Sequence, residues 1–165
     1  MRGGLYAIVD PAATRDRDPV RVAEAILRGG CARLQLRCKE SPDGARLALA
    51  RTLRERCREA GVRFVMNDRA DLALLSDADG LHLGQEDLAL GDARRVVGSM
   101  ELGRSTHDAA QALVAVREGA DLLGFGPIFT TRSKDRPCPP VGIEALGAVC
   151  RSAGRPVVAI GGVTL

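Results

Sequence analysis

The chain has 165 residues, of which 45% are hydrophobic and 27% are charged, as expected of one soluble globular domain with a core of its own. Its net charge of +3 and aromatic content of 2% argue against a nucleic-acid surface made of basic residues and stacking rings. No apolar run is long enough to cross a membrane, and the N-terminal segment does not resemble a secretory signal. Five cysteines without a CxxC pair predict reduced thiols in a cytoplasmic protein rather than disulfides or zinc.

Short apolar runs alternate with segments of helical spacing along the chain. The apolar runs predict strands at residues 5–10, 32–37, 63–68, 80–84, 101–106, 122–129 and 156–162. The segments between them predict helices at residues 19–30, 41–61, 70–75, 92–98, 108–120 and 141–154. We expect Ser41 to cap the second helix, and Ala109, Ala112, Leu113 and Val116 to face inward on the fifth. Strands alternating with helices indicate βαβ units and a parallel sheet.

Polar residues follow the carboxyl ends of nearly all the predicted strands. A (β/α)₈ barrel assembles its active site on that rim, whereas a doubly wound sheet binds ligands at one switch point. The distribution therefore favours an α/β fold of the (β/α)₈ barrel type, formed as one domain over residues 1–165. Only seven strands are predicted before the chain ends at GGVTL, so we expect the last helix, strand and helix to be missing from this chain.

Two carboxylates come directly after neighbouring predicted strands. Asp68 follows the only asparagine of the chain, Asn67, and Asp87 ends the sequence GLHLGQED. Two such charges repel unless a cation lies between them, and Mg²⁺ takes one or two carboxylates together with water and substrate phosphates. It is equally consistent with the sequence that Asp68 caps the following helix and that Asp87 ends a loop.

Cations and amides gather after the second predicted strand. Gln35, Arg37 and Lys39 alternate along it and so face one way, which suits either an oxyanion cradle or a solvated strand end. Lys39 and Lys134 are the only lysines among 24 basic residues. They are notable because lysine provides a compact point charge that arginine does not.

Hydroxyl groups and glycines follow the later predicted strands. Thr131 and Ser133 lie beside Lys134, a combination that suits a phosphate, and Ser105 is a further candidate phosphate donor. Gly161–Gly162 would let backbone N–H groups approach an anion, or would simply form a tight turn. His82 lies within a predicted strand, where a buried histidine is expected rather than a base.

Several motifs together resemble the thiamine-phosphate synthase family. They are QLRxK at 35–39, NDRxDLAL at 67–74, DGLHLGQED at 79–87, GPIFxTxSK at 126–134 and VVAIGG at 157–162. The resemblance extends over nearly the whole chain. It implies a (β/α)₈ barrel and a Mg²⁺-dependent transferase of thiamine biosynthesis. This enzyme joins 4-amino-2-methyl-5-(diphosphooxymethyl)pyrimidine to thiazole phosphate, giving thiamine phosphate and pyrophosphate.

The resemblance also implies roles for particular residues. Asp68 and Asp87 would bind Mg²⁺, and Gln35 would contact the pyrimidine. The diphosphate would be bound by Arg37, Lys39, Asn67, Ser105 and Lys134, of which Arg37, Lys39 and Lys134 would be catalytic. The thiazole phosphate would be faced by Thr131, Ser133, Gly161 and Gly162. The partners implied are small molecules, and homologous barrels often form homodimers.

The sequence departs from the family at a few points and leaves other functions open. Cys38 stands where an acidic residue is usual and Asp135 where a second lysine is common. We expect the last strand, whose loop would complete the thiazole-phosphate site by this resemblance, to be missing. GRST at 103–106 is similar to the related thiazole tautomerases, although Asp87 disfavours that activity. The sequence is also compatible with a non-catalytic paralogue or fragment that binds thiamine intermediates, and with a barrel that acts on sugar phosphates.

Overall fold

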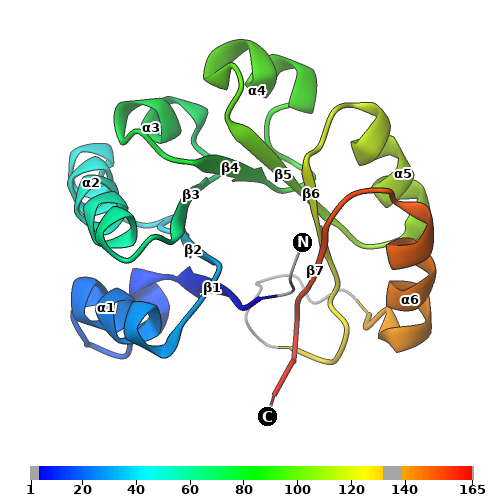
Figure 1. The fold of residues 1–165 in the computed structure, drawn as a ribbon, viewed down its shortest axis with the longest axis horizontal. Coiled ribbons are helices and arrows are strands. Elements are labelled where there is room, and N and C mark those ends of the chain that lie inside the picture. The colour runs from blue at the N-terminus through cyan, green and yellow to red at the C-terminus, as the bar shows by residue number, and fades with distance from the viewer. Residues whose placement is uncertain (1–3, 132–138, 165) are drawn as a thin grey trace. The chain divides into compact units, whose positions relative to one another are not determined.

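The computed structural model describes residues 4–131 and 139–164 (Figure 1). Within these ranges the elements are, in chain order, β1 (Tyr6–Val9), a 3₁₀ helix η1 (Pro11–Ala13), α1 (Pro19–Gly29), β2 (Arg33–Leu36), α2 (Asp43–Glu59), β3 (Arg63–Asn67), α3 (Ala70–Leu75), β4 (Gly80–Leu83), α4 (Leu90–Val97), β5 (Glu101–Thr106), α5 (Ala109–Arg117), β6 (Leu122–Phe125), α6 (Gly142–Ser152) and β7 (Val157–Ala159). The fold is therefore α/β, and the chain divides into two compact units.

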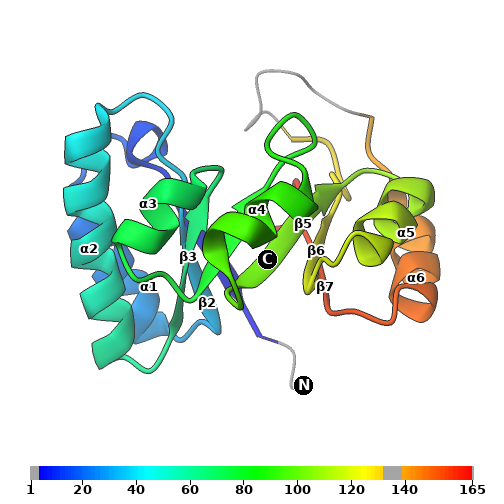
Figure 2. The ribbon, with the colours of Figure 1, turned by 90° about the horizontal axis from the view of Figure 1, so that it is seen from above.

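The first unit comprises residues 1–82 and 95–100 and contains β1, β2, β3 and most of β4. These strands pair in parallel in chain order, with Leu34 opposite Phe64 and Met66 opposite Leu81. All four of these side chains are fully buried. Helices α1, α2 and α3 lie along one face of the strands (Figures 1 and 2). Polar residues follow the carboxyl ends of the first three strands: Asp10 after β1, Arg37 after β2 and Asp68 after β3.

The second unit comprises residues 83–94 and 101–165 and contains β5, β6 and β7. These strands also pair in parallel, with Thr106 opposite Phe125 and Phe125 opposite Ala159. Leu102, Leu123 and Phe125 are among its fully buried side chains, and helices α5 and α6 pack along one side (Figure 2). In both units the near-continuous apolar runs of the strands are those typical of parallel sheets.

The predicted alternation of strands and helices is confirmed, with differences at element ends. α2 begins at Asp43 after Pro42 with no side-chain cap, so Ser41 as the cap is wrong. The Ser41 hydroxyl instead accepts a hydrogen bond from the Cys38 thiol at 3.1 Å. The strand predicted at 122–129 is too long, since β6 ends at Phe125. It ends there because Pro127 follows shortly and has no amide N–H to donate to a neighbouring strand.

The buried face of α5 was predicted only in part. Ala112 is buried as predicted and Val116 is half-buried, whereas Ala109 and Leu113 are exposed and Ala115, which was not predicted, is buried. The Asp108 carboxylate accepts from the Gln111 amide at 2.7 Å and caps the helix.

Within the described ranges no helix is both long and apolar enough to span a membrane. The cysteines that fall in those ranges, Cys31, Cys38, Cys57 and Cys150, are all free thiols. Cys138 lies outside the described residues.

Candidate active site

Two charged side chains pair where β1 and β2 end. Asp10 follows β1, Arg37 follows β2, and the Arg37 guanidinium donates to the Asp10 carboxylate. The Arg37 amide also donates to the Val9 carbonyl at 2.9 Å, which extends the parallel ladder to this point. Both side chains are largely buried, so the carboxylate fixes the orientation of the guanidinium.

A second ion pair joins the segments after β2 and β3. The Lys39 ammonium lies 3.5 Å from an Asp68 carboxylate oxygen, and Asn67 is the last residue of β3. Asp68 has a φ of +63°, in the left-handed region, and its amide donates to the His82 carbonyl at 2.8 Å. The N-cap of α3 is Arg69 without a side-chain bond, so the reading in which Asp68 caps this helix is wrong.

Arg69 anchors the segment that carries Asp68. Its guanidinium bonds to Asp71 at 2.6 Å and to Asp43, the first residue of α2, at 2.6 Å. The hydrogen bond that Arg69 donates to Asp71, and next the one it donates to Asp43, raise the pKa of the Arg69 side chain. The left-handed residue is thus followed by a firmly bonded one, which keeps the backbone of Asp68 in place.

Gln35 lies in a polar cluster inside the same unit. Its side chain is buried and donates to the Tyr6 hydroxyl at 2.9 Å. The Tyr6 ring meets the buried His82 ring edge-on, with centroids 6.4 Å apart. Strands β1, β2 and β4 therefore each contribute one polar ring or amide, and His82 is buried as expected.

In the second unit, Asp87 lies in the loop between β4 and α4. Its carboxylate accepts from the Gly84 amide at 2.6 Å. The Gln85 side-chain amide donates to the carbonyl of Ser105, near the end of β5. Asp87 therefore closes its loop, one of the two roles expected from the sequence, and this leaves its second carboxylate oxygen for other partners.

The glycine turn after β7 packs against the segment after β6. Gly161 has a φ of +95° and Gly162 one of +67°. The Phe129 amide donates to the Gly161 carbonyl at 2.9 Å. A Cβ atom on Gly161 would lie 2.5 Å from the Cβ of Pro127, so the backbone requires glycine here. Thr131, in the segment after β6, is half-buried, while Ser133 and Lys134 lie outside the described residues.

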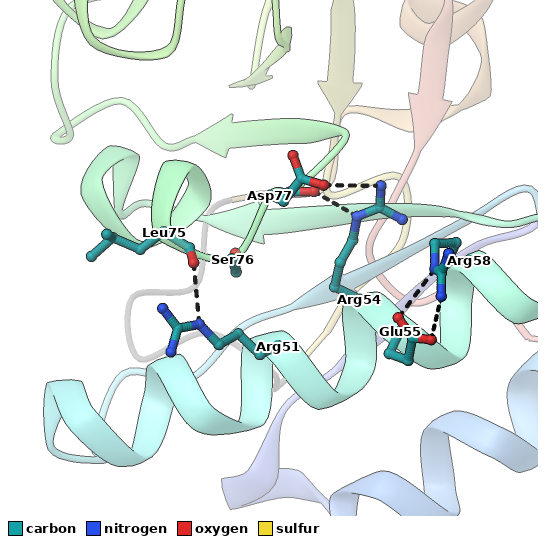
Figure 3. A pocket seen from close by; sticks show the side chains of 7 residues that line it. All are labelled: Arg51, Arg54, Glu55, Arg58, Leu75, Ser76 and Asp77. Carbon is teal, nitrogen blue, oxygen red and sulfur yellow. Dashed lines mark hydrogen bonds and ion pairs between the residues drawn. The ribbon is translucent and has the colours of Figure 1, made fainter.

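A pocket of about 400 Å³ lies elsewhere in the first unit, between α2 and the end of α3 (Figure 3). The Arg51 guanidinium donates to the Leu75 carbonyl at 3.2 Å, and Arg58 bonds to Glu55 at 2.6 Å. Arg54 donates to the Asp77 carbonyl (Figure 3). The hydrogen bonds of these arginines are made to other groups of the protein, and those of Arg51 and Arg54 connect α2 to the end of α3 and the residues after it. The pocket therefore has a structural role, and none of the predicted site residues lines it.

Three residues near the candidate site were missed by the sequence prediction: Asp10, Tyr6 and Arg104. Asp10 could have been found, because it follows a strand in the same way as Asp68. Tyr6 and Arg104 lie within strands, where the sequence gives no sign of their partners.

A metal would have to be held by few protein ligands. Among the residues with assigned positions there is no group of three or more histidine, cysteine, aspartate or glutamate side chains that fits a metal ion. Mg²⁺ does not need one, since it is commonly bound through one or two carboxylates plus water and substrate phosphates. Asp68 in the first unit and Asp87 in the second unit are each an oxygen donor of the type that Mg²⁺ takes.

A parallel α/β fold with carboxylates and cations at the ends of its strands defines a class of enzymes that bind phosphate-bearing ligands at that edge. Comparison with known proteins narrows the class. The chain belongs to the thiamine monophosphate synthase family, whose model matches residues 5–165.

Relatives of high sequence identity belong to the same family. The chain is 47% identical to a thiamine-phosphate synthase from Anaeromyxobacter dehalogenans, over 99% of this chain and 71% of that protein. It is 43% identical to one from Chloroflexus aurantiacus, over 96% of this chain and 74% of that protein. A solved structure of thiamine phosphate pyrophosphorylase from Pyrococcus furiosus aligns with a TM-score of 0.87 at 33% identity, over 96% of this chain and 75% of that one.

Proposed function

We propose that this chain is a thiamine-phosphate synthase that joins 4-amino-2-methyl-5-(diphosphooxymethyl)pyrimidine to thiazole phosphate and releases pyrophosphate. The observation that carries the proposal is 47% identity to a thiamine-phosphate synthase over 99% of this chain. The enzyme is a transferase of thiamine biosynthesis.

The diphosphate is assigned to the cations and amides at the strand ends. Arg37 and Lys39 supply positive charge and Asn67 an amide, and these residues follow or end neighbouring strands of the first unit. Ser105 belongs to the corresponding end of β5, and Lys134 completes the proposed set. The pairing of Arg37 with Asp10 supports its role, because a guanidinium held by a carboxylate through one nitrogen can present its other N–H groups to phosphate oxygens.

Mg²⁺ is proposed to be held by Asp68 and Asp87. When bound, it would neutralise charge on the diphosphate and so favour its departure. Asp68 is supported by its ion pair with Lys39, which places its carboxylate beside a cation that follows β2, and by the finding that it does not cap α3. The Lys39 ammonium lies 3.5 Å from the Asp68 carboxylate. It would exchange this carboxylate for the substrate's phosphate oxygens when the diphosphate and Mg²⁺ bind.

The chain's own residues act mainly by binding and orientation. Arg37, Lys39 and Lys134 stabilise the negative charge that grows on the leaving pyrophosphate as the bond from its oxygen to the methylene carbon breaks. Gln35, fixed by Tyr6, is proposed to hold the pyrimidine, whose amino group stabilises the methylene cation. The thiazole nitrogen then attacks that carbon, and no general base is required.

The phosphate of the thiazole is assigned to Thr131, Ser133 and the turn at Gly161–Gly162. This assignment is supported by the positive φ values of the two glycines, since successive amides in such a turn can form a concave site for anions.

We also propose that the strands belong to a (β/α)₈ barrel formed as one domain, as in other enzymes that place their sites at strand carboxyl ends. The alignment to 75% of the Pyrococcus furiosus protein supports this. A homodimer and a cytoplasmic location stay predictions.

The test is synthesis of thiamine phosphate from the two substrates with Mg²⁺, followed by chromatography of product and pyrophosphate. Asp87→Asn should reduce the rate at least about a hundredfold, as expected for a lost metal ligand. Glu86→Gln, which removes the same charge from the neighbouring residue, should change it less than about twofold. A folded protein that makes no product with both substrates and metal would refute the proposal.

A further inference from the structure

Arg104, on β5, holds the loop that carries Asp87. One guanidinium nitrogen donates to the Leu88 carbonyl at 3.0 Å, and the other terminal nitrogen donates to the Gln85 carbonyl at 3.3 Å. The two acceptors lie on either side of Asp87 in the chain. A single side chain therefore fixes the loop both before and after this carboxylate.

The burial and charge of Arg104 make this arrangement unusual. The residue is only 9% exposed, and its hydrogen-bond partners in the described ranges are these two neutral carbonyls, with no carboxylate forming an ion pair with it. Burying a charge without a countercharge is costly, and an apolar side chain would fill the same space at less cost. The guanidinium fork is required here only because it reaches two carbonyls at once.

The loop has further attachments to the same strand. Gln85 donates from its side chain to the carbonyl of Ser105, the residue after Arg104. The Gly84 amide donates to the Asp87 carboxylate at 2.6 Å, and the Asp87 amide donates to the Gly84 carbonyl at 3.4 Å. Residues of a short loop are thus bonded to two successive residues of β5 or to each other.

We propose that Arg104 is a positioning residue for Asp87, which it serves by fixing both arms of the loop against β5. The inference rests on the proposed role of Asp87 as a Mg²⁺ ligand. Arg104 does not touch substrate. It restricts the positions that the carboxylate can adopt, so that little ordering is left to occur when the metal binds.

The experiment compares Arg104→Met, Arg104→Lys and Arg94→Met in the whole protein. Methionine keeps the length but removes every donor, and lysine can still reach one carbonyl. Arg94→Met is the matched control, because Arg94 anchors α4 to Asp121 at 2.8 Å, away from the Asp87 loop. Two quantities are measured: amide hydrogen exchange of residues 84–90, and the Mg²⁺ concentration that gives half-maximal synthesis.

Arg104→Met should raise amide exchange in residues 84–90 at least about tenfold and raise the half-maximal Mg²⁺ concentration about 10- to 100-fold. The KM for thiazole phosphate should stay unchanged. Arg104→Lys should fall between this variant and the natural protein, and Arg94→Met should change neither quantity.

Equal loop exchange in Arg104→Met and Arg94→Met would overturn the proposal, whether or not the protein is active. Faster loop exchange with an unchanged Mg²⁺ requirement would overturn the link to the metal. If Arg104→Met does not fold, Arg104→Lys decides between these outcomes by the same two measurements. Absence of synthesis by the natural protein would instead refute the proposed function, and the exchange data would then still report on the loop.

Discussion

Replacing Gly162 by alanine should destabilise the protein far more than the same change at Gly154. Both glycines have left-handed backbones, with φ of +67° at Gly162 and +60° at Gly154. They differ in their surroundings. A Cβ on Gly162 would lie 2.5 Å from the Thr130 carbonyl oxygen and 2.8 Å from the Cβ of Phe129, whereas one on Gly154 would have nothing within 4 Å.

The pair therefore separates two costs. A residue other than glycine in the left-handed region costs roughly 1–2 kcal/mol, and both variants incur this cost. Overpacking adds about 1–3 kcal/mol, and it applies to Gly162 alone because the atoms in its way include backbone that cannot rotate aside. We expect a loss of unfolding free energy of about 1–2 kcal/mol for Gly154→Ala and about 2–5 kcal/mol for Gly162→Ala.

Urea unfolding measures both values, and an unchanged m-value would show that the difference lies in the folded state. Gly162→Ala should in addition raise the KM for thiazole phosphate, because the segment after β6 must move to admit the methyl group. Gly154→Ala should leave this KM unchanged. Equal losses of stability would refute the close approach of the two segments as the reason for glycine at this turn.

Three further predictions follow from single side chains. Asp10→Asn removes the countercharge of Arg37 and should lower kcat/KM for the pyrimidine diphosphate about tenfold, measured by steady-state kinetics. Burial raises the pKa of Cys57 to about 12, so a thiol reagent at pH 8 should modify it only after unfolding, as seen by peptide mass spectrometry. Burial opposes ionisation of Asp121, but hydrogen bonds from a strand amide and a guanidinium lower its pKa. Its stabilising contribution is present above the unfolded value near 3.9 and is lost as pH falls further, so Asp121→Asn should be less stable at pH 7 and lose less stability in acid.

Each of these predictions has an outcome that contradicts it. Unchanged kinetics in Asp10→Asn would mean that Arg37 is oriented without its partner. Rapid labelling of Cys57 in the folded protein would contradict its burial. An acid unfolding curve of the same shape with and without Asp121 would show that its low pKa does not contribute to stability.

The sequence predicted the elements well because their signals are local. The order of strands and helices follows from periodicity within a few residues, and Ala70–Leu75 was placed with the bounds that the structure has. The ends of strands were also a sound guide, since Lys39 and Asp68 were both singled out and lie 3.5 Å apart.

What was missed depends on partners far away in the chain. Arg37 finds Asp10 across 27 residues, and Arg104 finds the Gln85 carbonyl across 19. Neither pairing leaves a local pattern, because the contact exists only once parallel strands bring the segments together. The buried face of α5 was predicted only in part for a related reason: its sequence is alanine-rich, and the buried face is chosen by the strands beneath it rather than by hydrophobicity.

The charges at the strand ends of the first unit are already paired: Arg37 with Asp10, and Lys39 with Asp68. A substrate diphosphate that binds Lys39 must compete with Asp68 and leaves that acid without its cation, whereas Arg37 can keep Asp10 on one nitrogen and offer its other N–H groups to the phosphate. Two carboxylates and a diphosphate together carry more negative charge than two cations can balance. A divalent ion beside Asp68 would supply the difference. The pairing seen in the protein alone therefore gives a physical reason to expect that diphosphate and Mg²⁺ bind together, each strengthening the binding of the other.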